Sequence, residues 1–300
     1  MATCMEAGET VRLGYAQPYR FADLLRFFGA RALQGIELVD ESSYARTARV
    51  RGEDGDAFGW FRVRDDPQAG SLAVTVSKGL GPVLPHIVAR IRRQFDLDCD
   101  PAQVQKGLRS LGEMLPAGLW EGTRLPGCFD PFETACRAVI GQQVSVVAAN
   151  RMATRLVAAH GMPVDTGIDG LGRTWPAPDD ALFSGDVEAA LGELGIIRSR
   201  SRAIAEIACA IVDGRLDLGG DADAEQQMEA LMAIKGIGPW TANYVAMRVL
   251  GHPDAFLESD VGVAHALPDL APKERLRLAE AWRPWRSYAV INLWNLLSEE

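Results

Sequence analysis

Gly236-Ile237-Gly238 is a short stretch whose backbone can bind an anion. An apolar-periodic segment, 224–234, precedes it and a second one follows at once, so two helices joined by a hairpin are the simplest interpretation. Glycine permits a tight turn whose amides are unscreened by side chains, and Pro239 suits the first position of the second helix. Such amides at a helix N-terminus bind anions, and a DNA phosphate is the obvious candidate. A plain turn between helices is the alternative, because glycine is common at helix ends.

Two aromatic residues and two carboxylates follow the turn. Because Trp240 and Tyr244 are four residues apart, they lie on one face of the second helix. Glu258 and Asp260 come after a short loop. An aspartate in this place is a good N-cap for a helix that begins near Val261.

The segments around these residues resemble a known superfamily. LMAIKGIGPWTANYVAMR (231–248), followed by FLESD (256–260), resembles the helix-hairpin-helix, Gly/Pro-rich, Asp superfamily of DNA base-excision glycosylases. Within it, three further segments are similar to the bacterial 3-methyladenine DNA glycosylase II family: RLPGC (124–128), DPFETACRAVIGQQVS (130–145) and PWRSYAVINLW (284–294). The similarity runs from about residue 18 to residue 294.

The resemblance implies that Asp260 is the catalytic carboxylate. Positive charge develops on the sugar when an N-glycosidic bond breaks, so a fixed carboxylate stabilises the transition state and helps to activate water. The N-cap role is compatible with this one, because a cap fixes the carboxylate. Glu258 is expected to be a solvated loop carboxylate.

The resemblance also implies a pocket for a flipped-out base, lined by Trp240, Tyr244 and Trp294, with Phe27 from the N-terminal part. N-methylation makes a purine cationic, so stacking on a tryptophan ring would gain a cation–π term on the order of 0.5 to 2 kcal/mol. Simple core packing is the alternative for each ring.

The remaining contacts with DNA are also carried over from the family. The wedge that fills the vacated base stack falls on Gln143, where the family has an apolar side chain, with Gln142 before it. The contact with the DNA backbone is assigned to the hairpin residues Lys235, Gly236, Ile237, Gly238 and Thr241.

Trp240 stands where strand-cutting relatives carry the lysine that forms a Schiff base with the sugar. Lys235 lies before the first glycine and cannot take its place. We therefore expect a monofunctional DNA glycosylase that removes alkylated purines, of the 3-methyladenine and 7-methylguanine type, from duplex DNA and leaves an abasic site for base excision repair. Two alternatives stay open: a glycosylase for oxidised or deaminated bases on the same scaffold, and a non-catalytic helix-hairpin-helix DNA-binding module.

Composition indicates a folded protein of ordinary type. The 300 residues are 48% hydrophobic and 24% charged, and a net charge of -9 argues against a protein that coats DNA non-specifically. A local basic strip can still hold a few phosphates; the candidates are Arg198, Arg200 and Arg202, then Arg283 and Arg286. No apolar run approaches a membrane span, and residues 1–10 lack the apolar core of a signal peptide. We expect a monomer in the bacterial cytosol, with no membrane partner.

No side-chain metal site and no cofactor are expected. The five cysteines are scattered without C-x-x-C spacing, and the four histidines show no metal-binding motif. The iron–sulfur cluster of some relatives therefore has no ligands here. Whether a monovalent cation binds the hairpin carbonyls stays open.

The elements that must position these residues divide into two kinds. From 10 to about 98, β-rich runs and two helical patterns predict a small antiparallel sheet covered by two helices. From Pro101 onward strand signals vanish: helices are expected, the first of the long ones capped by Asp130 with Glu133 completing a capping box, and 161–178 looks like an irregular surface connection.

The fold class is thus mostly α with an N-terminal α+β domain. The resemblance specifies a helix-hairpin-helix DNA glycosylase architecture with three domains. These are 1–102 (sheet and two helices), 130–252 (helical, with the hairpin) and 103–129 together with 253–300 (a second helical domain).

Overall fold

The computed structural model describes residues 7–116 and 118–297. Residues 1–6, which belong to the stretch inspected for a signal peptide, lie outside the described residues. So do residues 298–300, which belong to the expected second helical domain.

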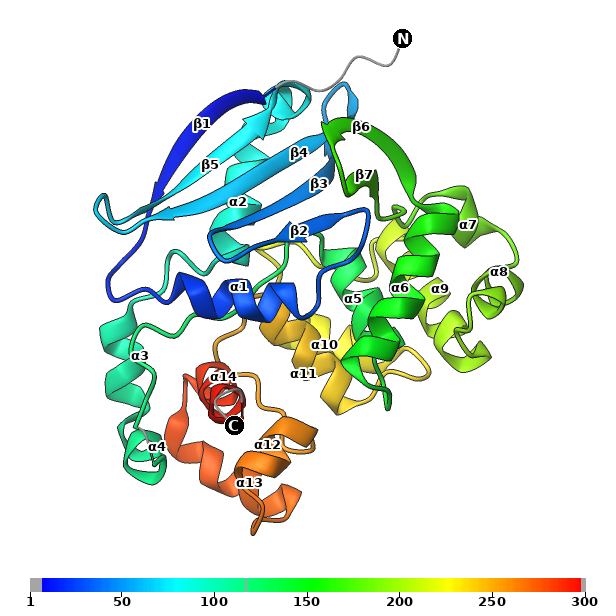
Figure 1. Ribbon diagram of the computed structural model, residues 1–300. Coiled ribbons are helices and arrows are strands. Elements are labelled where there is room, and N and C mark those ends of the chain that lie inside the picture. Colours follow the sequence, from blue (N-terminus) through cyan, green and yellow to red (C-terminus); the bar gives the residue numbers. More distant parts are fainter. Residues whose placement is uncertain (1–6, 117, 298–300) are drawn as a thin grey trace.

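The N-terminal part is the predicted antiparallel sheet with helices on one face (Figure 1). Its strands pair in the order β1-β5-β4-β3-β2, every pair antiparallel. The strands are β1 (Ala7–Gly14), β2 (Glu37–Val39), β3 (Ser43–Gly52), β4 (Gly55–Asp66) and β5 (Ser71–Ser77). The helices are α1 (Phe21–Gly29) and α2 (Leu84–Gln94), with the 3-10 turn η1 (Lys78–Val83) leading into α2.

Alternation along the strands decides which side chains meet these helices. Tyr44 of β3 and Phe61 of β4 join the core shared with α1 and α2, whereas Ala45 and Trp60, one residue away on the same strands, point to the other face. The face of α2 that joins this core is apolar, and four residues at helical spacing along it are at most 3% exposed: Val83, Ile87, Ile91 and Phe95.

A second, two-stranded sheet corrects the expected irregular connection over 161–178. β6 (Met162–Ile168) pairs with β7 (Leu171–Thr174) in antiparallel fashion. Buried Val164 and Thr166 alternate with exposed residues along β6, a period-two pattern interrupted in sequence by proline and glycine. Leu171 packs against Trp60 on the outer face of the first sheet. The β6–β7 pair therefore covers part of that face, a contact that the sequence of 161–178 alone does not indicate.

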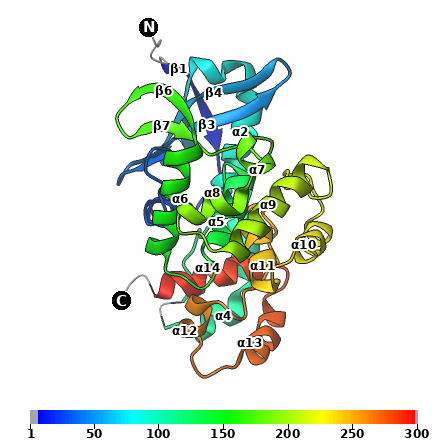
Figure 2. The ribbon, with the colours of Figure 1, turned by 90° about the vertical axis from the view of Figure 1, so that its right-hand side faces the viewer.

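The rest of the described chain is helical, as predicted. The helices are α3 (Pro101–Gly107), α4 (Arg109–Met114), α5 (Pro131–Ile140), α6 (Val146–His160), α7 (Ala181–Ser184), α8 (Val187–Glu193), α9 (Arg198–Val212), α10 (Ala224–Met232), α11 (Pro239–Arg248), α12 (Val261–Ala266), α13 (Pro272–Ala279), the 3-10 turn η2 (Glu280–Trp282) and α14 (Arg286–Leu296). In both views the sheet lies at one end and α13 at the other, with α5, α11 and α14 between them (Figures 1 and 2). Within the described ranges, no helix has the length and apolarity needed to cross a membrane.

The N-terminus of α5 is capped in part as predicted. The Asp130 carboxylate accepts a hydrogen bond from the Glu133 amide at 3.0 Å, so Asp130 is the N-cap. The expected return bond of a capping box is absent within the described chain, because the Glu133 carboxylate binds Arg46 at 2.7 Å and Arg137 at 2.8 Å instead. A buried glutamate beside two guanidinium groups gains more from them than from one amide.

Three hydrophobic cores support a division into three domains. One core lies under the N-terminal sheet, a second gathers α5, α6 and α8 to α11, and a third joins residues of 99–125 to residues of 246–293. We propose that these cores correspond to the three domains expected from the sequence, with the third assembled from two separate segments.

Asp96 is a buried carboxylate where two of these cores meet. Its Oδ2 accepts hydrogen bonds from the Leu125 amide and the Tyr288 hydroxyl, both at 2.9 Å. Burial raises the pKa of Asp96 to about 7, because loss of solvation outweighs these hydrogen bonds and the attraction of Arg124.

We expect Asp96→Asn to remove a pH dependence of stability. Between about pH 4 and pH 7 the folded wild type holds a proton on Asp96 that the unfolded chain has lost, so its free energy of unfolding falls as pH rises. The asparagine variant lacks this loss, and its stability relative to wild type should rise by about 2 to 4 kcal/mol across that window. Urea unfolding at a series of pH values measures it, and two parallel curves would contradict the assignment.

Candidate active site

The predicted helical hairpin is present as α10 and α11, and its two glycines act differently. Gly236 has φ +97°, a left-handed conformation that favours glycine. Gly238 is the N-cap of α11 with φ -102°, which any residue adopts, and a Cβ there would meet nothing within 4 Å. Within the described residues the amides of both glycines have no hydrogen-bond partner, so they are available to an anion at the start of α11.

Gln142 contacts this hairpin from the turn after α5. Its side-chain amide donates to the Gly236 carbonyl at 3.0 Å and to the Thr241 hydroxyl at 2.9 Å. The Arg200 guanidinium in turn donates to the backbone carbonyl of Gln142. The Gln142 side chain therefore braces the hairpin. Its amide already binds the Gly236 carbonyl, which is one of the hairpin carbonyls considered as a site for a monovalent cation.

Gln143 differs from its neighbour, although both were predicted for the wedge. Its side chain is exposed and its backbone has φ +54°, an uncommon conformation for a residue other than glycine. The exposed Gln143 lines the cavity described below, as Gln142 does, and the wedge role of the two glutamines stays a prediction.

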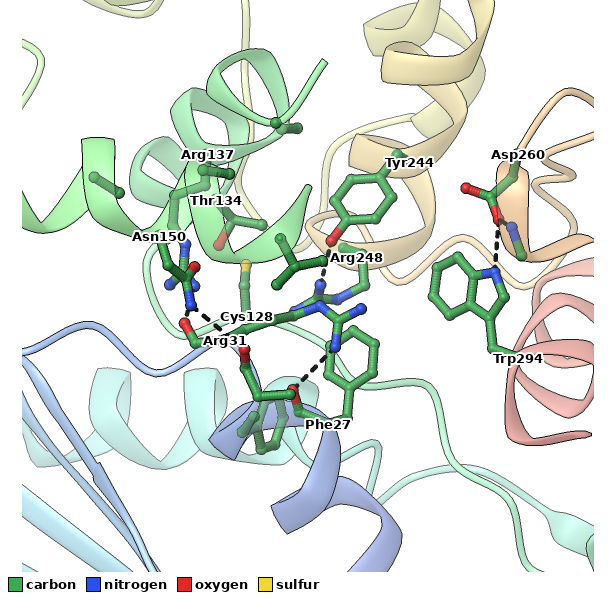
Figure 3. A pocket seen from close by; sticks show the side chains of 18 of the residues that line it. Phe27, Arg31, Cys128, Thr134, Arg137, Asn150, Tyr244, Arg248, Asp260 and Trp294 are labelled. Carbon is green, nitrogen blue, oxygen red and sulfur yellow. Dashed lines mark hydrogen bonds between the residues drawn. The ribbon is translucent and has the colours of Figure 1, made fainter. Parts of the chain in front are cut away.

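Asp260 is the N-cap of α12, as predicted, and its carboxylate is held from several sides. Oδ1 accepts the amides of Gly262 at 2.9 Å and Val263 at 3.1 Å, and the Trp294 indole Nε1–H at 2.8 Å (Figure 3). Oδ2 accepts the Trp240 indole Nε1–H at 3.1 Å. Oδ2 therefore has one donor where Oδ1 has three, and it is the oxygen with capacity left for a reacting group.

The four aromatic residues predicted for the pocket gather in two stacked pairs. Trp240 and Tyr244 of α11 stack with centroids 5.1 Å apart and an interplanar angle of 17°. Phe27 of α1 stacks on Trp294 of α14 at 6.1 Å and 14°. All four line one cavity of about 1280 Å³ together with Asp260, large enough for a ligand site at the junction of three parts of the fold.

Arginines that the sequence analysis missed stand among these rings. The Arg31 guanidinium lies 3.8 Å from the centroid of Phe27, and the Arg248 guanidinium 4.6 Å from it. Arg248 also donates to the Tyr244 hydroxyl at 2.7 Å (Figure 3). A cationic purine at Phe27 would therefore share this ring with two cations already present.

Helical spacing is the sequence signal that would have found them. Arg31 follows Phe27 by four residues and donates to its carbonyl at 3.2 Å, and Arg248 follows Tyr244 by the same interval. Side chains four apart meet on a helix, and Tyr244 and Arg248 both lie on α11, whereas Arg31 lies just beyond the end of α1.

The arginines alter the acidity of the tyrosine. Burial raises the pKa of Tyr244, but the positive charges of Arg248, Arg31 and Arg137 outweigh it, so the pKa of the phenol lies below its ordinary value. The pKa of Arg31 is lowered, by burial first and also by Arg248 and Arg137. Positive charge is therefore concentrated at this end of the cavity.

A buried ion-pair network also lies at this end of the cavity. The Glu133 carboxylate binds Arg46 of β3 and Arg137 of its own helix, at 2.7 and 2.8 Å. Arg137 also binds Glu37 at 3.3 Å and donates to the Arg31 carbonyl. Since removing one member of a buried pair leaves an uncompensated charge, this network fixes the N-terminal part against α5 and sets the place of Arg31.

Four of the five arginines in the predicted basic strips form ion pairs with acidic side chains. Arg198 and Arg202 both bind Glu188, while Arg283 and Arg286 bind Asp254 at 2.6 and 2.7 Å. Arg200 alone among the five turns toward the hairpin, through Gln142.

The other residues predicted for the site differ in their exposure and in their distance from the cavity. Lys235 and Ile237 belong to the hairpin turn, where Lys235 is exposed and Ile237 is buried, and the Thr241 side chain is buried against Gln142. Glu258 is not among the residues that line the cavity. Over residues 7–116 and 118–297, no group of three or more His, Cys, Asp or Glu side chains could hold a metal ion.

Sequence comparisons find relatives over nearly the whole chain. A family model described as the AlkA N-terminal domain matches residues 10–130. The chain is 36% identical to DNA-3-methyladenine glycosylase 2 of Escherichia coli (strain K12) over 282 residues, which cover 94% of this chain and 95% of that protein.

Solved structures give the same fold. A 3-methyladenine DNA glycosylase from Archaeoglobus fulgidus has a TM-score of 0.73 at 20% identity, covering 96% of this chain and 97% of that one. The 8-oxoguanine glycosylase/lyase of Clostridium acetobutylicum, solved in complex with double-stranded DNA containing cytosine opposite 8-oxoG, has a TM-score of 0.61 at 16% identity, covering 89% and 98%. At these identities the likeness establishes the fold alone.

The helical hairpin, the N-cap aspartate and the aromatic cavity on this scaffold define the helix-hairpin-helix class of DNA glycosylase folds. Given 36% identity over nearly the whole of both chains, the chain belongs to the DNA-3-methyladenine glycosylase 2, or AlkA, family.

Gln142→Ala should loosen the hairpin. The variant loses two hydrogen bonds and leaves the Thr241 hydroxyl without its donor, so we expect a loss of about 1 to 2 kcal/mol in the free energy of unfolding. Hydrogen exchange of the hairpin amides should also become faster. Gln143→Ala is the matched control, expected within about 0.5 kcal/mol of wild type because this side chain is exposed. Equal stability of the two variants would contradict the bracing role.

Proposed function

We propose that this protein is a monofunctional DNA glycosylase that hydrolyses the N-glycosidic bond of alkylated purines in duplex DNA. The observation that carries the proposal is the Asp260 carboxylate, held by two indole N–H groups at the wall of an aromatic cavity beside the hairpin. Its family membership supports the same reaction, since the Escherichia coli relative is named for 3-methyladenine.

The proposed reaction begins when the damaged nucleotide leaves the duplex, because its sugar cannot otherwise reach Asp260. The base enters the cavity between the stacked pairs, and Gln143 takes its place in the duplex. As the bond to the sugar C1′ breaks, positive charge develops there and the Asp260 carboxylate stabilises it. Water attacks C1′ with Oδ2 positioned to accept its proton, and the product is an intact strand with an abasic site.

DNA binding is assigned to the hairpin. The unpartnered amides of Gly236 and Gly238 suit a phosphate oxygen, and a phosphate contact of this kind fixes position without reading sequence. A protein of the same fold was solved on double-stranded DNA, which supports this partner. We propose that the enzyme acts as a monomer on DNA in the bacterial cytosol, with specificity for damaged bases coming from the cavity.

A specific observation favours the second candidate, a glycosylase for deaminated or oxidised bases. Arg31 and Arg248 place guanidinium N–H donors in the cavity, and such donors suit the carbonyl oxygens of these bases, whereas they repel a cationic purine. Release of bases from methylated, deaminated and oxidised duplexes, analysed by chromatography without added metal, ranks these substrates. No release from any of them would leave only DNA binding.

We expect Asp260→Asn to abolish turnover and to leave binding of a lesion duplex intact. Asparagine still caps α12, but loss of the charge should slow single-turnover cleavage by about 10² or more. Glu258→Gln is the matched control, a carboxylate two residues away that does not line the cavity. Wild-type turnover in Asp260→Asn, or an equal loss in the control, would refute the assignment.

We expect no covalent imine with DNA. Trp240 occupies the place of the lysine of strand-cutting relatives and its indole binds Asp260, while Lys235 is exposed on the hairpin turn. Incubation with a lesion duplex and borohydride, followed by a denaturing gel without hot alkali, should show neither a trapped band nor strand breaks. A trapped band that disappears in Lys235→Ala would show that this amine does reach the sugar.

A further inference from the structure

Arg275 of α13 is a buried cation outside the cavity. The residue is 8% exposed, and it is not among the residues that line the cavity. Within residues 7–116 and 118–297 its guanidinium has no carboxylate partner and makes two hydrogen bonds, both to backbone carbonyls. Burying a charge without an opposite charge is costly, so stability alone does not explain an arginine at this position.

The two carbonyls lie on either side of Asp260 in the chain. Arg275 Nη1 donates to the carbonyl of Glu258, two residues before the aspartate, at 3.1 Å. Nε donates to the carbonyl of Leu267, the C-cap of α12, at 3.3 Å. Asp260 is the N-cap of the same helix, which has six residues and is therefore about 9 Å long. One side chain thus holds the turn before α12 and the end of α12 together.

The turn that carries Asp260 has little else to fix its backbone. The Asp260 amide donates to the Leu257 carbonyl at 3.0 Å, a bond within the turn itself. From outside the turn, the described part of the chain supplies Glu258 and Ser259 with one hydrogen bond, the one from Arg275. Ser259 is also exposed, so packing does not hold it. The backbone just before Asp260 is therefore fixed by this guanidinium.

A guanidinium suits this task better than another donor would. Its N–H groups are held in one plane, so two carbonyls that bind it cannot move independently. Its charge lies at the C-terminal end of α12, where a cation interacts favourably with the helix dipole. A lysine places one ammonium on a flexible stem and would not hold two acceptors in one geometry.

We propose that Arg275 is a positioning residue for the reaction, one that holds residues 258–267 as a unit so that the Asp260 carboxylate is in place when the sugar of the flipped nucleotide arrives. Arg275 touches neither base nor sugar and acts through Asp260. The inference rests on the proposed glycosylase function. It adds a residue from α13, a helix that contributes nothing to the cavity wall.

Arg275→Met is the main test, because it removes both hydrogen bonds and keeps much of the side-chain volume. Single-turnover release of 7-methylguanine should fall by about 10 to 10², since a displacement of about 1 Å can cost this much. Affinity for the same duplex should stay within a few-fold, because the hairpin and the cavity wall are unchanged. Arg277→Met is the matched control, an exposed arginine on the same helix, and should match wild type in both measurements.

A double variant separates positioning of Asp260 from a general effect on the enzyme. In an Asp260→Asn background, Arg275→Met should cause little further loss of turnover, because the group that it positions is already gone. Hydrogen exchange gives a readout without DNA. The amides of Gly262 and Val263, which donate to Asp260 at 2.9 and 3.1 Å, should exchange faster in Arg275→Met and not in Arg277→Met.

Arg275→Lys is the second variant, and it serves if Arg275→Met does not fold. It keeps the charge and the stem but not the planar donors, so turnover should again fall while binding stays. Wild-type turnover in both variants, equal losses of turnover and binding, or the same loss with and without the Asp260 carboxylate would overturn the inference and leave the proposed function standing. A wild type that releases no base would refute the proposed function itself, and amide exchange would still report whether Arg275 holds the turn.

Discussion

The hydrogen bonds between the Asp260 carboxylate and two indole groups tie the separate parts of the site together. Trp240 comes from the hairpin helix α11, and Trp294 from the last helix α14. Each indole has two tasks, since it donates to the carboxylate and offers its ring to a stacked partner. A shift of α11 relative to α14 would therefore change the place of the carboxylate and the shape of the cavity at once. Such coupling is what a reaction that depends on fixed geometry requires.

A different interaction positions the N-terminal sheet domain, which contributes side chains to the wall of the cavity. Glu133 connects β3 to α5 through Arg46, and Arg137 carries the contact on to the Arg31 carbonyl. A buried network of this kind is a weak contributor to stability but a strong determinant of arrangement, because each member has one set of partners. The sheet domain therefore contributes Phe27 and Arg31 to the wall opposite Asp260.

The sequence predicted what depends on local pattern or on family motif. Periodicity gave α2 and the hairpin helices, and the N-cap roles of Asp130 and Asp260 followed from residue type and position. The strands β6 and β7 were missed, because Pro163 and glycines interrupt a short alternation whose partner surface is built by Trp60, far away in the chain. The partners of Glu133 were also missed, since a capping box is a local expectation and Arg46 is 87 residues distant. Long-range electrostatics overrode local propensity there.

The charge distribution explains how a chain of net charge -9 is compatible with binding DNA. Four of the five arginines considered for the backbone are bound to Glu188 or Asp254. We propose that the hairpin binds a phosphate through neutral amides, which release few counterions from DNA and so give a weaker salt dependence than a basic surface. Positive charge also lies within the cavity, where Arg31 and Arg248 stand beside Tyr244. We propose that binding to undamaged DNA is therefore weak, and that the interactions that distinguish one base from another are made with the base that enters the cavity.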